Sequence, residues 1–335
     1  MTIRIGINGF GRIGRGVFRA GFKRKDIEFV GINDITNSKT LAHLLKYDSA
    51  HGSFPYSVKV VDEGLEVDGK YIPVSAERDP VNIPWNKWEV DYVIESTGLF
   101  RKYDLASKHL SGNVKRVLIS APGKGGPVKT FVLGVNEHLF NPEEDKIVSN
   151  ASCTTNCYAP VTKVIDDNFG VESGFMTTVH SYTSDQRILD APHGDLRRAR
   201  SAAMNIIPTS TGAAIAVGKV LPHLEGKLDA MSIRVPSPNV SLIDAVYTLK
   251  SEVGKEEILD AFREAANGKM KGILAISEEP LVSIDYNGNP HSAIVDFDYV
   301  FAMGNQIKVV AWYDNETGYS NRMIDLVEFI SKKEN

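Results

Sequence analysis

The chain has 335 residues, enough for two domains of roughly 150 residues each, and its 42% hydrophobic and 24% charged residues are ordinary for a globular protein and exclude wholesale disorder. A net charge of −4 disfavours a dedicated nucleic-acid-binding protein, which is usually basic, and favours a small ligand. Only two cysteines are present, so a disulfide-stapled secreted domain is excluded and a reducing interior fits. The sequence shows neither a targeting signal nor a run of about 18 apolar residues, so we expect a cytoplasmic protein with no membrane span.

Short apolar runs alternate with helical patterns in the first 150 residues. Helical spacing follows the first run, as in Ile13, Val17 and Gly21. We predict strands over 3–7, 27–33, 91–96, 116–120, 130–135 and 146–149. The alternation predicts an α/β domain with a doubly wound, mostly parallel sheet. The polar–apolar stretch 55–75, which contains turn residues, predicts a hairpin inserted into that domain.

The pattern of apolar and polar residues changes after about residue 150, where longer β-rich runs alternate more clearly between apolar and polar residues. We predict strands over 174–182, 228–235, 239–249, 292–300 and 306–313 and helices near 154–167, 211–220 and 255–267. The pattern predicts an α+β domain with a mostly antiparallel sheet. We therefore expect domains over 1–150 and 151–317, with a C-terminal helix at about 318–335 that packs back on the first.

One segment fits neither pattern. Residues 183–204 are polar, rich in arginine and without a clear period. Long irregular stretches inside compact domains are often functional, but a solvated basic face explains the composition equally well.

The glycines of a G-x-G-x-x-G motif stand between the first predicted strand and the first predicted helix, at Gly9, Gly11 and Gly14. Such a turn lets the backbone approach a pyrophosphate, and the helix N-terminus offers free N–H groups to the phosphates. Asp34 ends the second strand, 20 residues after Gly14, where a carboxylate binds the ribose hydroxyls and repels a 2′-phosphate. These features predict a Rossmann-type dinucleotide site that prefers NAD to NADP, and we also assign Arg12, Ile13 and Ser120 to it.

Cys153 lies between an apolar strand and a helical pattern, which places it at a helix N-terminus. The helix dipole there stabilises a thiolate and is expected to lower the pKa of the thiol. Cys157 lies one turn further on and loses that benefit. A zinc site needs two more ligands, and no H-x₃₋₅-H pair supplies them, so we expect no metal.

His180 ends the strand predicted over 174–182 and opens the irregular segment. A lone histidine is often structural, but a histidine beside Cys153 would form an activated thiolate pair.

Three motifs together resemble those of the phosphorylating glyceraldehyde-3-phosphate dehydrogenase family. They are the glycine turn at 7–15, Ala-Ser-Cys-Thr-Thr-Asn at 151–156 and Tyr-Asp-Asn-Glu at 313–316. The resemblance runs in order from residue 3 to about residue 330. It implies NAD as cofactor, glyceraldehyde 3-phosphate and inorganic phosphate as substrates, and a homotetramer in which the segment 183–204 packs between subunits near the cofactor.

The resemblance also implies roles for individual residues. Cys153 is the nucleophile, His180 is its base, and Asn315 orients the nicotinamide amide. The residues implied to hold the substrate's C3 phosphate are Thr183 and Arg234, with Asp185 beside them. Those implied to hold inorganic phosphate are Ser152, Thr154, Arg198, Thr211 and Gly212.

Two alternatives remain at the level of sequence. Erythrose-4-phosphate dehydrogenases look similar, but they tend to lose the threonines and glycine matching Thr183, Thr211 and Gly212, which this chain keeps. A catalytically silent NAD-binding module that senses redox state or binds RNA has no reason to keep Cys153, His180 and Arg234 together. Selectivity for NAD rests on Asp34, although Ala191 stands where leucine is frequent in strictly NAD-dependent members.

Overall fold

The computed structural model describes residues 2–334, which form two compact units. The first comprises the chain up to Phe131, His138–Ala151 and the chain from Ser320 onward, and the second comprises Val132–Glu137 and Ser152–Tyr319. The assignment of 132–137 to the second unit differs from the continuous 1–150 domain expected from the sequence. The backbone of Gly134 packs so closely in the second unit that a Cβ there would lie 3.3 Å from Cδ1 of Ile273.

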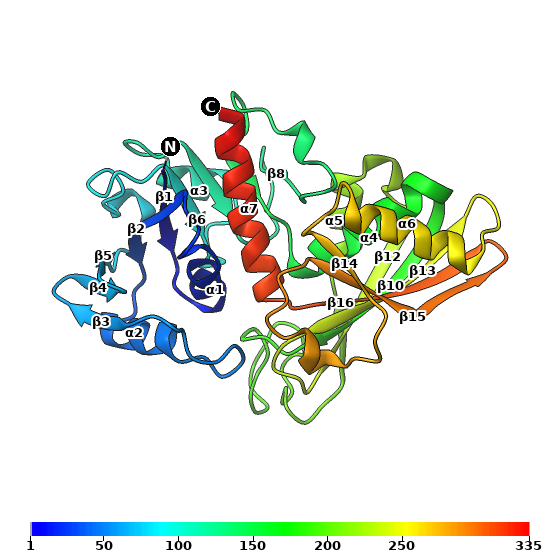
Figure 1. The fold of residues 1–335 in the computed structure, drawn as a ribbon. Helices are drawn as coiled ribbons and strands as arrows, with labels where there is room; N and C mark the ends of the chain where they lie inside the picture. Colours follow the sequence, from blue (N-terminus) through cyan, green and yellow to red (C-terminus); the bar gives the residue numbers. More distant parts are fainter. Residues whose placement is uncertain (1, 335) are drawn as a thin grey trace. The chain divides into compact units, whose positions relative to one another are not determined.

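A nine-stranded sheet organises the first unit, in the order β3-β4-β5-β2-β1-β6-β7-β9-β8 (Figure 1). Its strands are β1 (Ile3–Asn8), β2 (Ile27–Asn33), β3 (Val58–Val61), β4 (Gly64–Val67), β5 (Lys70–Ser75), β6 (Tyr92–Glu95), β7 (Arg116–Ile119), β8 (Lys129–Thr130) and β9 (Ile147–Ser149). Every neighbouring pair from β5 across to β8 is parallel, and the pairs β3–β4 and β4–β5 are antiparallel. The prediction of a mostly parallel, doubly wound sheet is confirmed.

Helices accompany this sheet. They are α1 (Arg12–Gly21), α2 (Ser38–Lys46), α3 (Tyr103–Ala106), the last helix α7 (Thr317–Glu334), and the short 3-10 helices η1 (Pro80–Asn82), η2 (Ser107–His109) and η3 (Glu137–Leu139). From Ser320 onward α7 belongs to the first unit, where Asp325 pairs with Arg24 at 2.5 Å and the ring of Phe329 packs edge-on against Phe140.

Two predictions for the first half are wrong in detail. The apolar run 130–135 is a strand only at its start, because the backbone then turns: Val132 N–H donates to Asn136 Oδ1 at 2.9 Å and Val135 N–H donates to the Val132 carbonyl at 3.0 Å. The stretch 55–75 forms three strands, and the third, β5, continues the parallel sheet by pairing with β2.

A seven-stranded sheet organises the second unit, in the order β11-β12-β10-β13-β16-β15-β14. Its strands are β10 (Val171–Ser181), β11 (Ile207–Ser210), β12 (Leu228–Val235), β13 (Ser241–Leu249), β14 (Leu274–Ser277), β15 (Ala293–Met303) and β16 (Gln306–Tyr313). Only β10–β12 and β14–β15 are parallel, so the prediction of a mostly antiparallel sheet is confirmed. The sequence analysis missed β11 and β14, which have only four residues each and too little alternation to detect.

Three helices lie together on one side of this second sheet in Figure 1. They are α4 (Cys153–Phe169), α5 (Ala213–Val220) and α6 (Lys255–Asn267), and the 3-10 helices η4 (Pro222–Leu224) and η5 (Ser283–Tyr286) complete the unit. The alternation in β13 follows from this arrangement, since Ile243, Ala245 and Tyr247 are fully buried while residues between them are less so. Among residues 2–334, no helix combines the length and apolar character needed to cross a bilayer.

Candidate active site

Cys153 is the first residue of α4, as the sequence predicts. The helix begins there because Ser152 caps it: Ser152 Oγ accepts a hydrogen bond from the Thr155 N–H at 3.1 Å. Ala151, immediately before the cap, has φ of 56°, a left-handed conformation that non-glycine residues rarely adopt and that often occurs at functional sites. The thiol therefore stands at the positive end of the α4 dipole.

His180 reaches this thiol from the neighbouring sheet. It is the penultimate residue of β10, and its Nε2 lies 3.6 Å from Cys153 Sγ. The parallel pairing of β10 with β12 places His180 opposite Arg234, 54 residues away in the sequence. Strand register thus brings the imidazole and a guanidinium together, and the N-terminus of α4 adds the thiol.

Burial governs the charge states of this pair. It raises the pKa of the Cys153 thiol, and the nearby Arg234 and the Thr154 N–H offset only part of that effect. Burial and then the positive charge of Arg234 lower the pKa of His180 from 6.5 to about 3. The expectation that the helix dipole alone would lower the pKa of Cys153 is therefore wrong for the ligand-free chain, because desolvation of the charged form outweighs it. Both shifts favour an uncharged thiol beside an uncharged imidazole over the charged pair.

The other ring nitrogen of His180 has two partners. Nδ1 lies 2.7 Å from the Ser181 carbonyl oxygen and 2.9 Å from Nη1 of Arg234. A neutral imidazole carries one N–H, so when Nδ1 donates to the carbonyl, Nε2 faces the thiol as a base. When Nδ1 accepts from Arg234, Nε2 carries the hydrogen and can donate to an anion at the same place. The His180 ring can therefore take a proton from Cys153 or stabilise a negative charge beside it.

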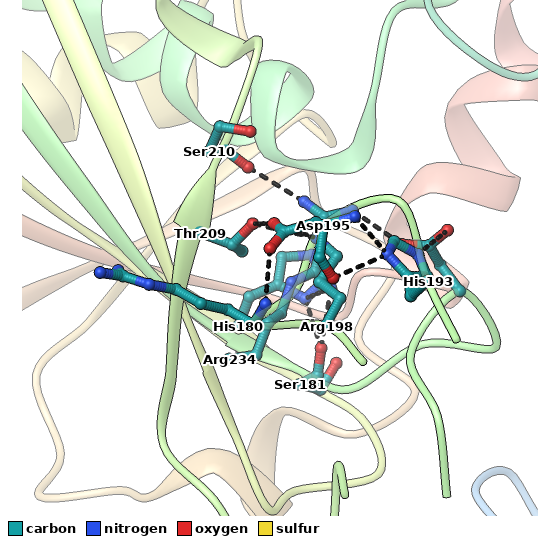
Figure 2. Close-up of polar contacts among 10 residues, drawn as sticks. His180, Ser181, His193, Asp195, Arg198, Thr209, Ser210 and Arg234 are labelled. Carbon is teal, nitrogen blue, oxygen red and sulfur yellow. Dashed lines mark hydrogen bonds and ion pairs between the residues drawn. The ribbon is translucent and has the colours of Figure 1, made fainter. Parts of the chain in front are cut away.

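A second cationic group, built around Arg198, lies in the irregular segment (Figure 2). Nη1 of Arg198 donates to Asp185 at 2.7 Å, Nε donates to Thr209 Oγ1 at 3.0 Å, and Nη2 donates to the Ser210 carbonyl at 3.1 Å. The positive charge of Arg198 also contributes to the lowered pKa of His180. The segment 183–204 is thus not simply a solvated basic face, because it delivers a fixed guanidinium close to the imidazole.

Three other predicted phosphate ligands fall into two groups. Thr211 and Gly212 stand at the N-terminus of α5, where Gly212 is the cap residue, and a Cβ on Gly212 would meet no atom within 4 Å. Thr154 is 96% buried, and its hydroxyl bonds the Tyr313 hydroxyl at 2.9 Å. The structure therefore directs Thr154 towards the interior, whereas Gly212 borders open space.

Tyr313 is a site residue that the sequence analysis missed. Its hydroxyl joins Thr154 to Thr178, each at 2.9 Å, and its ring packs edge-on against His180. The only sequence signal was its place just before Asn315 in the third family motif. Asn315 itself is buried, and its Oδ1 accepts hydrogen bonds from Ser181 at 2.9 Å and Ser241 at 3.0 Å, which fixes the orientation of its amide.

The first unit carries a separate pocket of about 290 Å³ at the carboxyl ends of its strands. Its lining residues are Asn8, Gly9, Gly11, Asn33, Asp34, Ile35, Glu77, Arg78, Ser96, Thr97, Leu99 and Phe100. Gly9 has φ of 88°, and a Cβ on Gly14 would lie 2.1 Å from the Gly9 carbonyl oxygen, so the turn tolerates no side chain at either position. This is the close strand–helix packing that a dinucleotide turn requires.

Asp34 is held at the edge of this pocket by backbone donors. Its Oδ2 accepts from the Phe10 N–H at 2.7 Å and its Oδ1 accepts from the Thr36 N–H at 2.9 Å. Each carboxylate oxygen has a further lone pair, so Asp34 can still accept hydrogen bonds from ribose hydroxyls. The glycine turn and this fixed carboxylate fit an NAD molecule.

Other predicted cofactor residues do not line this pocket. Arg12 turns its side chain to Asp48, with Nη1 2.5 Å from Oδ2, and Ile13 and Gly14 lie inside α1. Ser120 follows β7 and donates its N–H to the Glu95 carbonyl at 2.9 Å. Conversely, Arg78 and Thr97 line the pocket and were missed, because each lies just after a strand with no motif to mark it.

No metal centre accompanies these sites in the part of the chain that the structure describes: residues 2–334 contain no group of three or more His, Cys, Asp and Glu side chains placed to hold an ion.

Comparison with known proteins gives full-length similarity. The family model for the glyceraldehyde 3-phosphate dehydrogenase NAD binding domain matches residues 3–103, and the model for the C-terminal domain of the same enzymes matches residues 152–315. The chain is 56% identical over 334 residues to a glyceraldehyde-3-phosphate dehydrogenase of Geobacillus stearothermophilus, covering 99% of both chains. It is 56% identical over 334 residues to the same enzyme of Priestia megaterium and 55% identical to glyceraldehyde-3-phosphate dehydrogenase 1 of Bacillus subtilis, again with 99% of both chains covered.

Proposed function

The chain belongs to the glyceraldehyde-3-phosphate dehydrogenase family, and we propose that it oxidises and phosphorylates glyceraldehyde 3-phosphate to 1,3-bisphosphoglycerate with NAD as cofactor. Family membership confirms the sequence-based prediction of an NAD-dependent dehydrogenase. It does not favour the erythrose-4-phosphate alternative or a silent NAD-binding module. Residues 1–150 serve as the NAD-binding domain and residues 151–317 as the catalytic domain in this proposal.

The first chemical step joins the substrate to Cys153. Sγ attacks the aldehyde carbon while His180 Nε2, 3.6 Å away, takes the thiol proton, so the pair becomes charged only as the new bond forms. The product is a hemithioacetal whose oxygen carries the negative charge. The Cys153 N–H at the α4 N-terminus and the protonated Nε2 of His180 both donate towards that oxygen.

The oxidation step requires a base and a hydride acceptor. NAD, when bound, supplies the acceptor for the hydride that leaves the hemithioacetal carbon. His180 Nε2 first gives its proton to the hemithioacetal oxygen and takes it back as the hydride leaves, while Nδ1 donates to the Ser181 carbonyl oxygen, 2.7 Å away. Asn315, its amide oriented by two serine hydroxyls, is assigned to hold the nicotinamide amide.

The last step needs two anion sites. Arg234 and Thr183, with Asp185 beside them, are assigned to the C3 phosphate of the substrate. Inorganic phosphate is assigned to Arg198, Ser152, Thr211 and Gly212, with Thr154 in the buried layer behind Cys153. Attack of this phosphate on the thioester carbon expels the Cys153 thiolate, which recovers its proton from His180.

The contact between Cys153 Sγ and His180 Nε2, with two arginines beside it, is the observation that carries this assignment. The test is NADH formation from glyceraldehyde 3-phosphate with and without inorganic phosphate. We expect turnover that requires phosphate, and a Cys153→Ser variant that binds NAD but forms no NADH. Phosphate-independent turnover, or preference for the four-carbon aldehyde, would contradict the proposal.

We also propose a homotetramer that acts in the cytoplasm. Large apolar side chains are exposed along and just after the segment 183–204, at Ile188, Leu189, Leu196, Met204 and Ile206. Exposed apolar surface of this kind is typical of subunit interfaces. Both cysteines are free thiols, which suits a reducing compartment. Light scattering coupled to size exclusion should give four times the chain mass, and a monomer mass would refute the tetramer.

A further inference from the structure

A buried contact between a carboxylate and an imidazole lies beneath the dinucleotide pocket of the first unit and has no part in the chemistry above. Glu95, the last residue of β6, is 1% exposed, and His109 in η2 is fully buried. Nε2 of His109 lies 3.1 Å from Glu95 Oε2. Burying a charged carboxylate is costly unless all its lone pairs are satisfied, so this arrangement calls for a reason.

Glu95 connects the ends of three adjacent strands. Asn8, the last residue of β1, donates from Nδ2 to Glu95 Oε2 at 2.6 Å. Asn33, the last residue of β2, donates from Nδ2 to Asn8 Oδ1 at 2.8 Å. On the other side, Thr97 donates both its N–H, at 2.8 Å, and its hydroxyl to Glu95 Oε1. Asn8, Asn33 and Thr97 all line the dinucleotide pocket, whereas Glu95 and His109 lie behind it.

Fixed donors at both ends set the direction of every hydrogen bond in this network. The indole N–H of Trp85 donates to His109 Nδ1 at 3.1 Å, so the hydrogen of that ring is on Nε2 and points at Glu95. The Glu77 N–H donates to Asn33 Oδ1 at 2.8 Å, so the amide nitrogen of Asn33 must face Asn8. Four donors thus converge on the two oxygens of Glu95, and three of them, the Thr97 N–H, the Asn8 amide and the His109 Nε2–H, are fixed as donors by their other partners.

The same network touches the glycine turn. The Thr97 N–H that Glu95 holds lies so close to the turn that a Cβ on Gly9 would be 2.7 Å from that nitrogen. Ser96 donates to the Gly9 carbonyl at 2.6 Å, and the Gly9 N–H donates to the Asn33 carbonyl at 2.8 Å. Displacing Glu95 would therefore move the floor of the pocket and the turn that approaches the pyrophosphate.

We propose that Glu95, with its charge held by His109, is a positioning residue for NAD: it aligns the ends of β1, β2 and β6 so that Asn8, Asn33 and Thr97 present a fixed surface to the cofactor. The inference rests on the proposed NAD-dependent function. Glu95→Gln is the sharpest perturbation, because it keeps the shape but replaces one acceptor with an amide nitrogen that must face at least one fixed N–H donor in either orientation. His109→Phe is the second variant: it removes one donor, and the ring fits beside Trp85 and Phe100, which already pack on the imidazole.

The experiment compares NAD binding by calorimetry and steady-state kinetics in the full-length wild type, both variants and Asp145→Asn. Asp145 is the matched control: it is a buried carboxylate of the same unit, paired with Lys129 at 2.9 Å and absent from the pocket lining. We expect Glu95→Gln to raise the Kd and KM for NAD by about fivefold or more. His109→Phe should raise them less. The KM for the aldehyde and kcat at saturating NAD should stay within about twofold.

Distinct outcomes separate this inference from the function on which it rests. If the wild type itself binds no NAD, both fall. If the wild type binds NAD and folded Glu95→Gln or His109→Phe binds it equally well, the positioning role alone is refuted. An equal rise in the Kd for Asp145→Asn would also refute it, because the effect would then follow from general destabilisation of the unit.

Discussion

The depressed pKa of His180 makes the stability of this protein depend on pH in a defined window. The imidazole titrates near 6.5 in the unfolded chain and at about 3 in the folded chain, because burial and Arg234 oppose its positive charge. Between these values the unfolded chain binds a proton that the folded chain does not, so the free energy of unfolding falls as the pH falls below about 6.5. From pH 7.5 to pH 5, His180 should remove about 2 kcal/mol of stability.

The His180→Gln variant tests this reasoning. Glutamine keeps a carbonyl oxygen that can accept from Arg234 but does not titrate, so its stability should lose about 2 kcal/mol less than the wild type over the same pH range. Urea unfolding at fixed protein concentration, followed by circular dichroism at pH 7.5 and pH 5, measures the difference. Arg234→Met, which removes only the second cause of the shift, should give a smaller reduction. Parallel pH dependences for wild type and His180→Gln would show that His180 is not kept uncharged by the fold.

Three further predictions concern the glycine turn, its carboxylate and the helix that carries the nucleophile. Gly14→Ala should abolish NAD binding in calorimetry while secondary structure persists, because the new Cβ would lie 2.1 Å from the Gly9 carbonyl oxygen; retained affinity would contradict the close packing. Asp34→Asn should raise kcat/KM for NADP relative to NAD by about tenfold, since it removes the charge that repels a 2′-phosphate, and an unchanged ratio would assign selectivity elsewhere. Ser152→Ala should lower the free energy of unfolding by about 1 kcal/mol, measured in urea at pH 7.5, because the Thr155 N–H loses its hydrogen-bond acceptor. Ser152→Asp should restore the free energy of unfolding, because aspartate also caps a helix N-terminus.

Local sequence patterns predicted the elements that have strong periodicity or clear end signals. The strands 27–33, 228–235 and 306–313 and the helix 255–267 agree with the structure in both bounds. The glycine turn was recognisable because its spacing and its place after a strand serve one physical purpose. The failures lie where a run is short or is overridden by packing: β14 has four residues, and the apolar run 130–135 turns away to pack in the second unit.

The charge state of the nucleophile could not be read from its position in a helix. The sequence predicts a lowered pKa for Cys153 from the α4 dipole, but the tertiary structure surrounds this partly buried residue with protein, and the resulting desolvation reverses the direction of the shift. Desolvation depends on which parts of the folded chain surround a group, and the residues next to that group in the sequence do not reveal this. The same holds for Tyr313, whose hydroxyl joins two threonines that lie 159 and 135 residues away in the sequence.

The sequence by itself determined the fold class, the dinucleotide turn and NAD as the cofactor, and it identified Asp34 and Cys153 as candidate site residues, because each depends on residues within one strand–turn–helix unit or one motif. Only the tertiary structure decided which residues act together. Strand register set His180 beside Arg234, the irregular segment 183–204 brought Arg198 close to both, and three strand ends converged on Glu95. Those contacts join residues far apart in the chain, and only the folded packing of the sheets specifies them.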